Sequence, residues 1–213
     1  MTTKHLIPAD ISEAYQVEEW RNATGVISTA HPNEWADVIE ALRNFDFRRS
    51  ELLTGGGAKS RIAARLDAFL TARGWRETKF ETMIKVDKDE RASPTHKVDC
   101  FKGRVGLEIE WNNKDPFFDR DLNNFRLLFD LRVIDIGIIV TRASNLQDVF
   151  RSLGPKVALK YGASTTHMDK LLPRIEGGGG GGCPILAFGI TRARYVEDEM
   201  PTAEQGADDD DGE

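Results

Sequence analysis

The sequence lacks the features of membrane, secreted and disordered chains. It contains 2 cysteines in 213 residues, too few for a disulfide framework, so we expect a reducing cytoplasm as its compartment. No apolar run is long enough to cross a bilayer, and we expect neither a membrane partner nor a secretory signal. Hydrophobic residues make up 40% and charged residues 30% of the chain, which is typical of a globular domain and excludes a fibrous chain.

The net charge of −6 is concentrated at the end of the chain. Nine acidic and no basic residues follow residue 196, so residues 1–196 carry a net charge of +3. A run of like charges among small residues buries too little apolar surface to fold, and we expect residues 198–213 to form a disordered acidic tail. Residues 1–197 then make up a single, mildly basic domain.

Apolar spacing predicts mostly helices first and strands afterwards. Helical spacing marks five segments: 35–45, 62–70, 119–132, 146–150 and 169–176. Strand patterns mark five more: 80–86, the two halves of 97–111, 134–141 and 183–191. Polar residues 88–95 are interpreted as a connection and glycines 177–182 as a hinge or loop tip. The alternation predicts an α/β or α+β fold with a central mixed β-sheet flanked by helices.

The most informative segment is a β-hairpin predicted over 97–111. A two-residue turn at Lys102-Gly103 would pair Phe101 with Arg104. Side chains alternate between the two faces of a hairpin. One face is then wholly apolar: Val98, Cys100, Val105, Leu107, Ile109 and Trp111. The other face collects three carboxylates around a glycine with no side chain to fill the space: Asp99, Gly106, Glu108 and Glu110.

Three carboxylates on one face require compensation. Two of them about 5 Å apart repel by roughly 3 kcal/mol at an effective dielectric of about 20. A hard divalent cation such as Mg²⁺ suits an all-oxygen ligand set. The alternative is an exposed face whose acids are solvated or paired with Lys and Arg. The apolar opposite face, and the amide and ammonium donors of Asn112, Asn113 and Lys114 directly after the acids, favour a cation site.

These residues together resemble a known nuclease core. The resemblance rests on Asp99, the run from Glu108 to Asn113, the helix with Asn123, Asn124 and Phe125, and the strand from Ile134 to Val140. The pattern over 79–190 is similar to the PD-(D/E)xK superfamily, and more narrowly to the BglII/BstYI/BamHI-like group of type II restriction endonucleases. The resemblance implies a bacterial, Mg²⁺-dependent enzyme that acts on double-stranded DNA as a homodimer.

The resemblance also assigns roles to the acids. Asp99 and Glu108 would bind Mg²⁺, and Glu110 would stand where the superfamily usually has Lys, as in the BamHI-like Glu-x-Glu form. A Mg²⁺-bound water is acidified, and Glu110, crowded by two acids, would accept its proton. A fourth acid from the preceding element would complete the site. Glu77 and Glu81 are the candidates, with an ordinary surface role as the alternative for each.

Two segments are candidates for reading DNA bases. Asn113 stands five residues after Glu108, where the family places a base-contacting side chain, and a turn leaving a strand is the alternative interpretation. The loop 160–167 resembles the family's recognition loop, with a simple helix cap as the alternative. Lys59, at a glycine-rich helix start, is a candidate for a phosphate contact. The residues nominated for DNA contact are Asn112, Asn113, Lys114, Lys160, Ser164, Thr165, Thr166 and Lys59.

The leading hypothesis is a type II restriction endonuclease that cuts both strands of a short palindrome, with a GATC-centred site implied by the resemblance. A second hypothesis keeps the same core but assigns structure-specific or repair cleavage. A third is a non-catalytic DNA-binding protein whose acids hold structural cations. Discrete cleavage bands, broad degradation, or binding without cleavage would distinguish the three.

Overall fold

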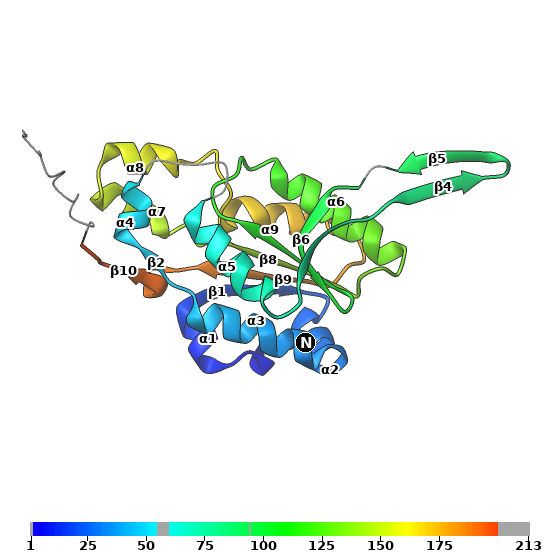
Figure 1. Ribbon diagram of the computed structural model, residues 1–213, viewed down its shortest axis with the longest axis horizontal. Helices are drawn as coiled ribbons and strands as arrows, with labels where there is room; N and C mark the ends of the chain where they lie inside the picture. The colour runs from blue at the N-terminus through cyan, green and yellow to red at the C-terminus, as the bar shows by residue number, and fades with distance from the viewer. Residues whose placement is uncertain (1, 55–59, 94, 200–213) are drawn as a thin grey trace, which may run out of the picture.

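A six-stranded mixed β-sheet forms the centre of the molecule. The computed structural model describes residues 2–54, 60–93 and 95–199. The order of strands is β1-β9-β8-β7-β6-β3, with β7, β8 and β9 parallel and the other neighbours antiparallel (Figure 1). These strands are β1 (Tyr15–Trp20), β3 (Arg76–Lys79), β6 (Lys97–Lys102), β7 (Val105–Glu110), β8 (Ile136–Arg142) and β9 (Ile185–Ile190).

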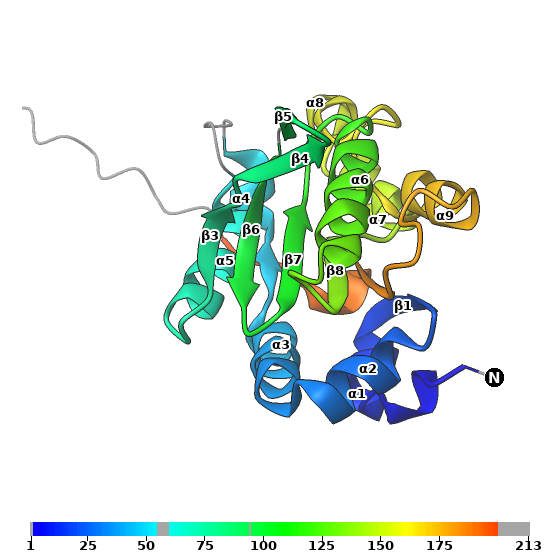
Figure 2. The same ribbon diagram turned by 90° about the vertical axis from the view of Figure 1, so that its right-hand side faces the viewer.

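Helices cover both faces of this sheet, which confirms the predicted class. α6 lies on one side of the sheet and α5 on the other (Figure 2). Apolar residues of α6 and α9 form one core cluster, and those of α1 to α3, α5, α7 and α8 form the other. The helices are α1 (Ala9–Ala14), α2 (Ala23–Ala30), α3 (Pro32–Asn44), α4 (Arg49–Leu53), α5 (Arg61–Thr71), α6 (Phe117–Asp130), α7 (Leu146–Ser152), α8 (Pro155–Lys160) and α9 (Met168–Glu176), with short 3-10 turns at Lys4–Leu6 and Arg192–Arg194. Every residue of β8 and β9 is buried, as in parallel strands covered on both sides.

Five strands were not expected from the sequence: β1, β2 (Phe47–Arg48), β3, β5 (Asp89–Ser93) and β10 (Tyr195–Val196). β1 precedes the first predicted helix, and it pairs antiparallel with β9 along its whole length. Residues 88–95 were predicted as a polar connection, whereas β5 (Asp89–Ser93) pairs with β4 (Thr82–Val86). This β4–β5 hairpin projects from the body of the molecule (Figure 1). A polar strand becomes possible here because the neighbouring strand supplies its backbone hydrogen bonds.

A second pair of short strands, β2 (Phe47–Arg48) and β10 (Tyr195–Val196), joins distant parts of the chain in parallel.

Cys100 and Cys183 are both free and buried. Among the described residues, every helix is too short or too polar to span a bilayer. The predicted acidic tail lies outside the described residues, apart from Asp198 and Glu199.

Two glycines bring α6 close to the sheet. Gly106 on β7 and Gly137 on β8 are register partners. A Cβ added to them would lie 3.0 Å and 2.4 Å from the nearest ring carbon of Phe125. We expected Gly106 to leave space beside the acids, but the Phe125 ring covers it. The close approach therefore fixes α6 against β7 instead of leaving room for an ion at this point.

Candidate active site

The hairpin of β6 and β7 has a different turn from the predicted one. Lys102 pairs with Val105 and Phe101 with Gly106, so the turn is Gly103-Arg104. Gly103 has φ +59° and therefore suits the first position of a two-residue turn, where a positive φ is required. The turn lies one residue later than predicted, but side chains of β7 still alternate between the two faces. Glu108 and Glu110 therefore stay on the α6 face with Gly106.

A β-bulge changes the direction of side chains on β6. Arg76 of β3 pairs with Phe101 and Thr78 with Val98, so Asp99 and Cys100 together lie opposite a single β3 residue. Val98 consequently packs with the α6 cluster, and its predicted place on the other apolar face is wrong. The remaining predicted members of that face do pack together: Cys100, Val105, Leu107, Ile109 and Trp111. Bulges commonly redirect side chains beside active sites.

Asp99 and Glu108 hold each other in place across the hairpin. The Asp99 backbone N–H donates to Glu108 Oε2 at 3.3 Å, and the Ile109 N–H donates to Asp99 Oδ2 at 3.1 Å. Each of these two carboxylates thus accepts a hydrogen bond from the other's strand. The two acids that were predicted to bind a cation are therefore neighbours.

Three buried carboxyls meet between β7 and α6. Glu108, Glu110 and Asp121 are each 1% exposed. Burial raises the pKa of Glu110 to about 9, with the charge of Asp121 as the second cause. Burial and the charges of Asp121 and Asp99 raise the pKa of Glu108 well above its usual range, and burial raises that of Asp121. Perturbed acids in contact with one another are typical of functional sites.

A guanidinium and an amide supply the polar contacts of this group. Arg120 Nη2 lies 2.7 Å from Asp121 Oδ1 and 3.5 Å from Glu110 Oε1, and Asn113 Nδ2 donates to Glu110 Oε2 at 2.7 Å. Glu108 Oε1 and Asp121 Oδ2 are buried without a hydrogen-bond partner. In the described parts of the chain, no three His, Cys, Asp or Glu side chains are arranged to hold a metal ion. The donors are nevertheless the oxygens that Mg²⁺ prefers, and two of them lack a partner.

Asp121 of α6 lies with the acids of β7, whereas the two candidates from the element before the hairpin lie at the surface. Glu77 on β3 forms a surface ion pair with Lys97 at 2.7 Å and its side chain is 57% exposed. Glu81 is exposed as well. Sequence reasoning missed Asp121, although a signal existed: it follows Phe118 by three residues and precedes Phe125 by four, inside the apolar face of a helix.

The two segments nominated for reading DNA lie side by side. Lys114 forms an isolated β-bridge with Thr165, and the Thr166 N–H donates to the Asn113 carbonyl at 2.8 Å. Asn113, Lys114 and Ser164 are exposed. The structure thus brings together two loops that the sequence separates by about 50 residues, beside the end of β7.

Several nominated side chains are engaged inside the protein. Thr166 is 0% exposed and its hydroxyl donates to the Glu110 carbonyl at 3.3 Å. The Thr165 hydroxyl donates to the Gly162 carbonyl at 2.7 Å. Lys160 donates to the Thr54 carbonyl at 3.3 Å, and Asn112 Oδ1 is buried without a partner. Lys59 lies outside the described residues.

A buried arginine that sequence reasoning missed holds the second loop. Arg142, at the end of β8, is 2% exposed. Its guanidinium donates to the carbonyls of Thr166 at 2.9 Å, Tyr161 at 3.0 Å and Gly162 at 3.4 Å, and also bonds the Thr165 hydroxyl. Burial lowers the pKa of Arg142 to about 10. The loop is therefore anchored to the strand next to the one that carries Glu108 and Glu110.

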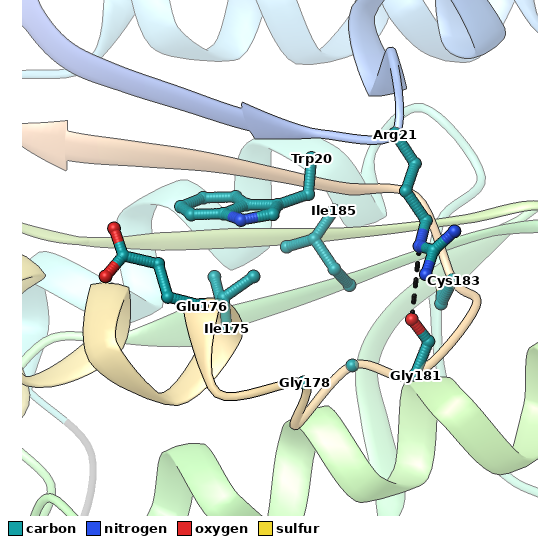
Figure 3. Close-up of a pocket in the computed structure, with 9 residues that line it drawn as sticks. Trp20, Arg21, Ile175, Glu176, Gly178, Gly181, Cys183 and Ile185 are labelled. Carbon is teal, nitrogen blue, oxygen red and sulfur yellow. Dashed lines mark hydrogen bonds between the residues drawn. The ribbon is translucent and has the colours of Figure 1, made fainter.

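A pocket of about 190 Å³ lies elsewhere, at the start of β9 (Figure 3). It is lined by the end of β1, the end of α9 and the predicted glycine hinge, whose Gly181 carbonyl accepts a hydrogen bond from Arg21 at 3.2 Å. Its ionisable lining consists of Arg21, Glu176 and the buried thiol of Cys183. This pocket lacks a group of acids, so we assign the chemistry to the carboxyls between β7 and α6.

Comparison with protein families agrees with the fold. A family model described as restriction endonuclease BglII/BglIII matches residues 15–190. The match begins at the first residue of β1 and ends at the last residue of β9, so it includes the whole central sheet. No curated protein matches the chain.

Proposed function

The chain belongs to the restriction endonuclease BglII/BglIII family, and on that basis we propose that it is a type II enzyme that hydrolyses double-stranded DNA at a short palindrome. The observation that carries the proposal is the contact between Asp99 and Glu108 beside the buried Glu110. We further propose a GATC-centred target and a homodimer in which each subunit cuts one strand. A two-fold protein matches the symmetry of a palindrome.

The proposed roles follow from the positions of the acids. Asp99 and Glu108 would hold Mg²⁺, which acidifies a bound water and polarises the phosphate when it is bound. The hydrogen bonds between the two strands orient both carboxylates before any ion arrives. Asn113 fixes one oxygen of Glu110, whose other oxygen faces Arg120. Glu110 accepts the proton of the attacking water in this scheme.

The proposed DNA-reading surface consists of the exposed residues Asn113, Lys114 and Ser164. An Asn amide can bond an adenine edge and a Lys ammonium a guanine edge in the major groove. The link from Asn113 to Glu110 means that a base contact at Asn113 would also alter the position of the acid. Thr165 and Thr166 support the loop, and we propose no base contact for them.

Plasmid cleavage tests the chemistry directly. We expect Asp99→Ala and Glu108→Gln to lose cleavage by about 100-fold or more, because each variant removes one oxygen ligand of the cation. Glu77→Gln should cleave like wild type, since its carboxylate bonds Lys97 at the surface. The assay uses supercoiled plasmid with Mg²⁺ and follows the loss of the supercoiled band.

Equal cleavage by Asp99→Ala and wild type would exclude the assigned site. Sequencing the ends of digested genomic DNA then identifies the target. Ends at one short palindrome support a restriction enzyme, whereas scattered ends favour a structure-specific nuclease and would contradict the proposal.

A further inference from the structure

Asp121 and Arg120 approach the carboxyls of β7 from the helix side. The Asp121 side chain is 1% exposed, whereas the Arg120 side chain is 30% exposed and lies 4.3 Å from the centre of the Phe117 ring. The guanidinium bonds Asp121 Oδ1 through Nε at 2.9 Å and Nη2 at 2.7 Å, and Nη2 is 3.5 Å from Glu110 Oε1. A single partly exposed cation thus bridges an acid of the helix and an acid of the strand.

Packing fixes the position of Asp121. Phe125 lies four residues further along α6 and is held against Gly106 and Gly137. Residues four apart share one face of a helix, so the contact that seats Phe125 also directs Asp121 toward β7. A carboxylate inside an apolar helix face is costly unless it is paired or coordinates a cation. Arg120 meets only part of that requirement.

The unsatisfied oxygens lie where Arg120 does not reach. Glu108 Oε1 and Asp121 Oδ2 are buried and have no hydrogen-bond partner. Arg120 bonds the other oxygen of Asp121, and its second contact is to Glu110. Buried polar atoms are rarely left unpaired. Two unpartnered carboxylate oxygens in one group indicate a further cation, and oxygen donors favour a hard divalent ion.

We propose that Asp121 is a further acid of the divalent-cation site and that Arg120 compensates its charge until the ion binds. This inference rests on the proposed function, which supplies the cation as a cofactor. Two positive charges repel strongly at short range in a site of low dielectric, so the ion and the guanidinium compete for the same carboxylates. Arg120 is partly exposed, and its side chain can turn toward solvent without opening the core.

Binding of Mn²⁺ to the full-length, metal-free protein tests this competition without DNA. Titration calorimetry compares wild type with Asp121→Asn and Arg120→Gln. Asp121→Asn should weaken Mn²⁺ binding by about tenfold or more, because losing a ligand, or a residue that supports a ligand, lowers metal affinity by at least that factor. Arg120→Gln should tighten binding by roughly threefold, because it removes a competing ion pair at a partly exposed position. The matched controls are Asp119→Asn and Arg126→Gln, exposed residues of the same helix that should bind Mn²⁺ like wild type.

The two variants are expected to change Mn²⁺ affinity in opposite directions, which separates this inference from a structural role of Asp121. If Asp121 only supports the fold, Asp121→Asn will lower the unfolding temperature equally with and without Mn²⁺ and leave the affinity unchanged. Wild-type affinity in Asp121→Asn, or weaker binding in Arg120→Gln, overturns the inference. Arg120→Gln changes a partly exposed residue and still decides the question if Asp121→Asn does not fold.

Plasmid cleavage, measured in parallel, separates the inference from the proposed function. Absence of cleavage by the wild-type protein rejects the proposed function while the Mn²⁺ affinities still test Asp121. Cleavage by wild type together with unchanged Mn²⁺ affinity in Asp121→Asn rejects the inference alone.

Discussion

Burial controls the protonation of the acids at the site. Glu110 has a pKa raised to about 9 by burial and by Asp121, although the Asn113 amide and the Arg120 guanidinium act in the opposite direction. Glu108 and Asp121 are shifted the same way. A nearby cation lowers such values. Glu110 is therefore suited to accept a proton only when a cation compensates the group, which links the proposed base to cofactor binding.

The raised pKa of Glu110 predicts that the metal-free protein loses stability as pH rises. The group contributes stability that is fully present below its ordinary value of 4.5 and is lost as pH rises through about 9. The free energy of unfolding should therefore fall between about pH 7 and pH 9, by up to about 1.4 kcal/mol per pH unit for one proton. Urea unfolding in EDTA at several pH values measures this slope.

Between pH 7 and pH 9 the stability is free of a contribution of opposite sign from His167. Burial lowers the pKa of His167 below 6.5. The contribution of His167 to the free energy of unfolding therefore increases as pH rises, and this increase is complete by about pH 7. Glu110→Gln should flatten the decline above pH 7. A stability that rises with pH in this window, or an equal decline in Glu110→Gln, would show that Glu110 is not the group that titrates.

At the scale of elements, the alternation of β7 was predictable and the geometry of β6 was not. The faces of Leu107, Glu108, Ile109 and Glu110 follow from the two-residue period alone. The bulge at Asp99 depends on β3, which pairs with β6 from outside the hairpin. No pattern within 97–111 contains that information, so Val98 was assigned to the wrong face.

The position of α6 could not be predicted either, although the helix itself was. Its apolar spacing indicates which face is buried, but not which strands receive it. That choice depends on Gly106 and Gly137, two residues on different strands whose pairing exists only in the folded sheet. Asp121 reaches the acids as a consequence of this contact, whereas the spacing of the sequence pointed only to Glu77 and Glu81, which are exposed.

The anchoring of the second loop by Arg142 predicts a large loss of stability when the guanidinium is removed. Arg142→Met keeps most of the side-chain volume but leaves the carbonyls of Tyr161 and Thr166 without this donor, whereas the Gly162 carbonyl keeps the Thr165 hydroxyl. Buried polar groups left unpaired cost about 1–3 kcal/mol each, so we expect a loss of about 3 kcal/mol or more in the free energy of unfolding by urea. Arg151→Met is the control, because its side chain is 68% exposed, and it should change stability by less than about 0.5 kcal/mol. Similar small losses in both variants would mean that the loop does not depend on Arg142.

At the scale of the whole molecule, the proposed functional groups gather at one edge of the sheet. Glu110 ends β7 and Arg142 ends β8, and these strands are parallel. Parallel strands bring their carboxyl ends to the same edge, where ligand sites of α/β sheets commonly lie. The loop after β7 bonds the loop 160–167 that Arg142 anchors. One chain thus combines one set of acids with one proposed DNA-reading surface, and the proposed cutting of both strands at a palindrome would use a second copy.

Mixed dimers test whether each subunit cuts one strand. Wild-type protein should convert a one-site supercoiled plasmid to linear DNA with little nicked intermediate, because two sites act on opposite strands of one palindrome. After subunit exchange with an excess of Asp99→Ala protein, most active dimers contain one intact site. These dimers should accumulate nicked circles, which agarose gels separate from linear DNA. Linear product without nicked circles in the mixture would mean that one subunit cuts both strands, and the dimer would then serve DNA binding instead of paired cleavage.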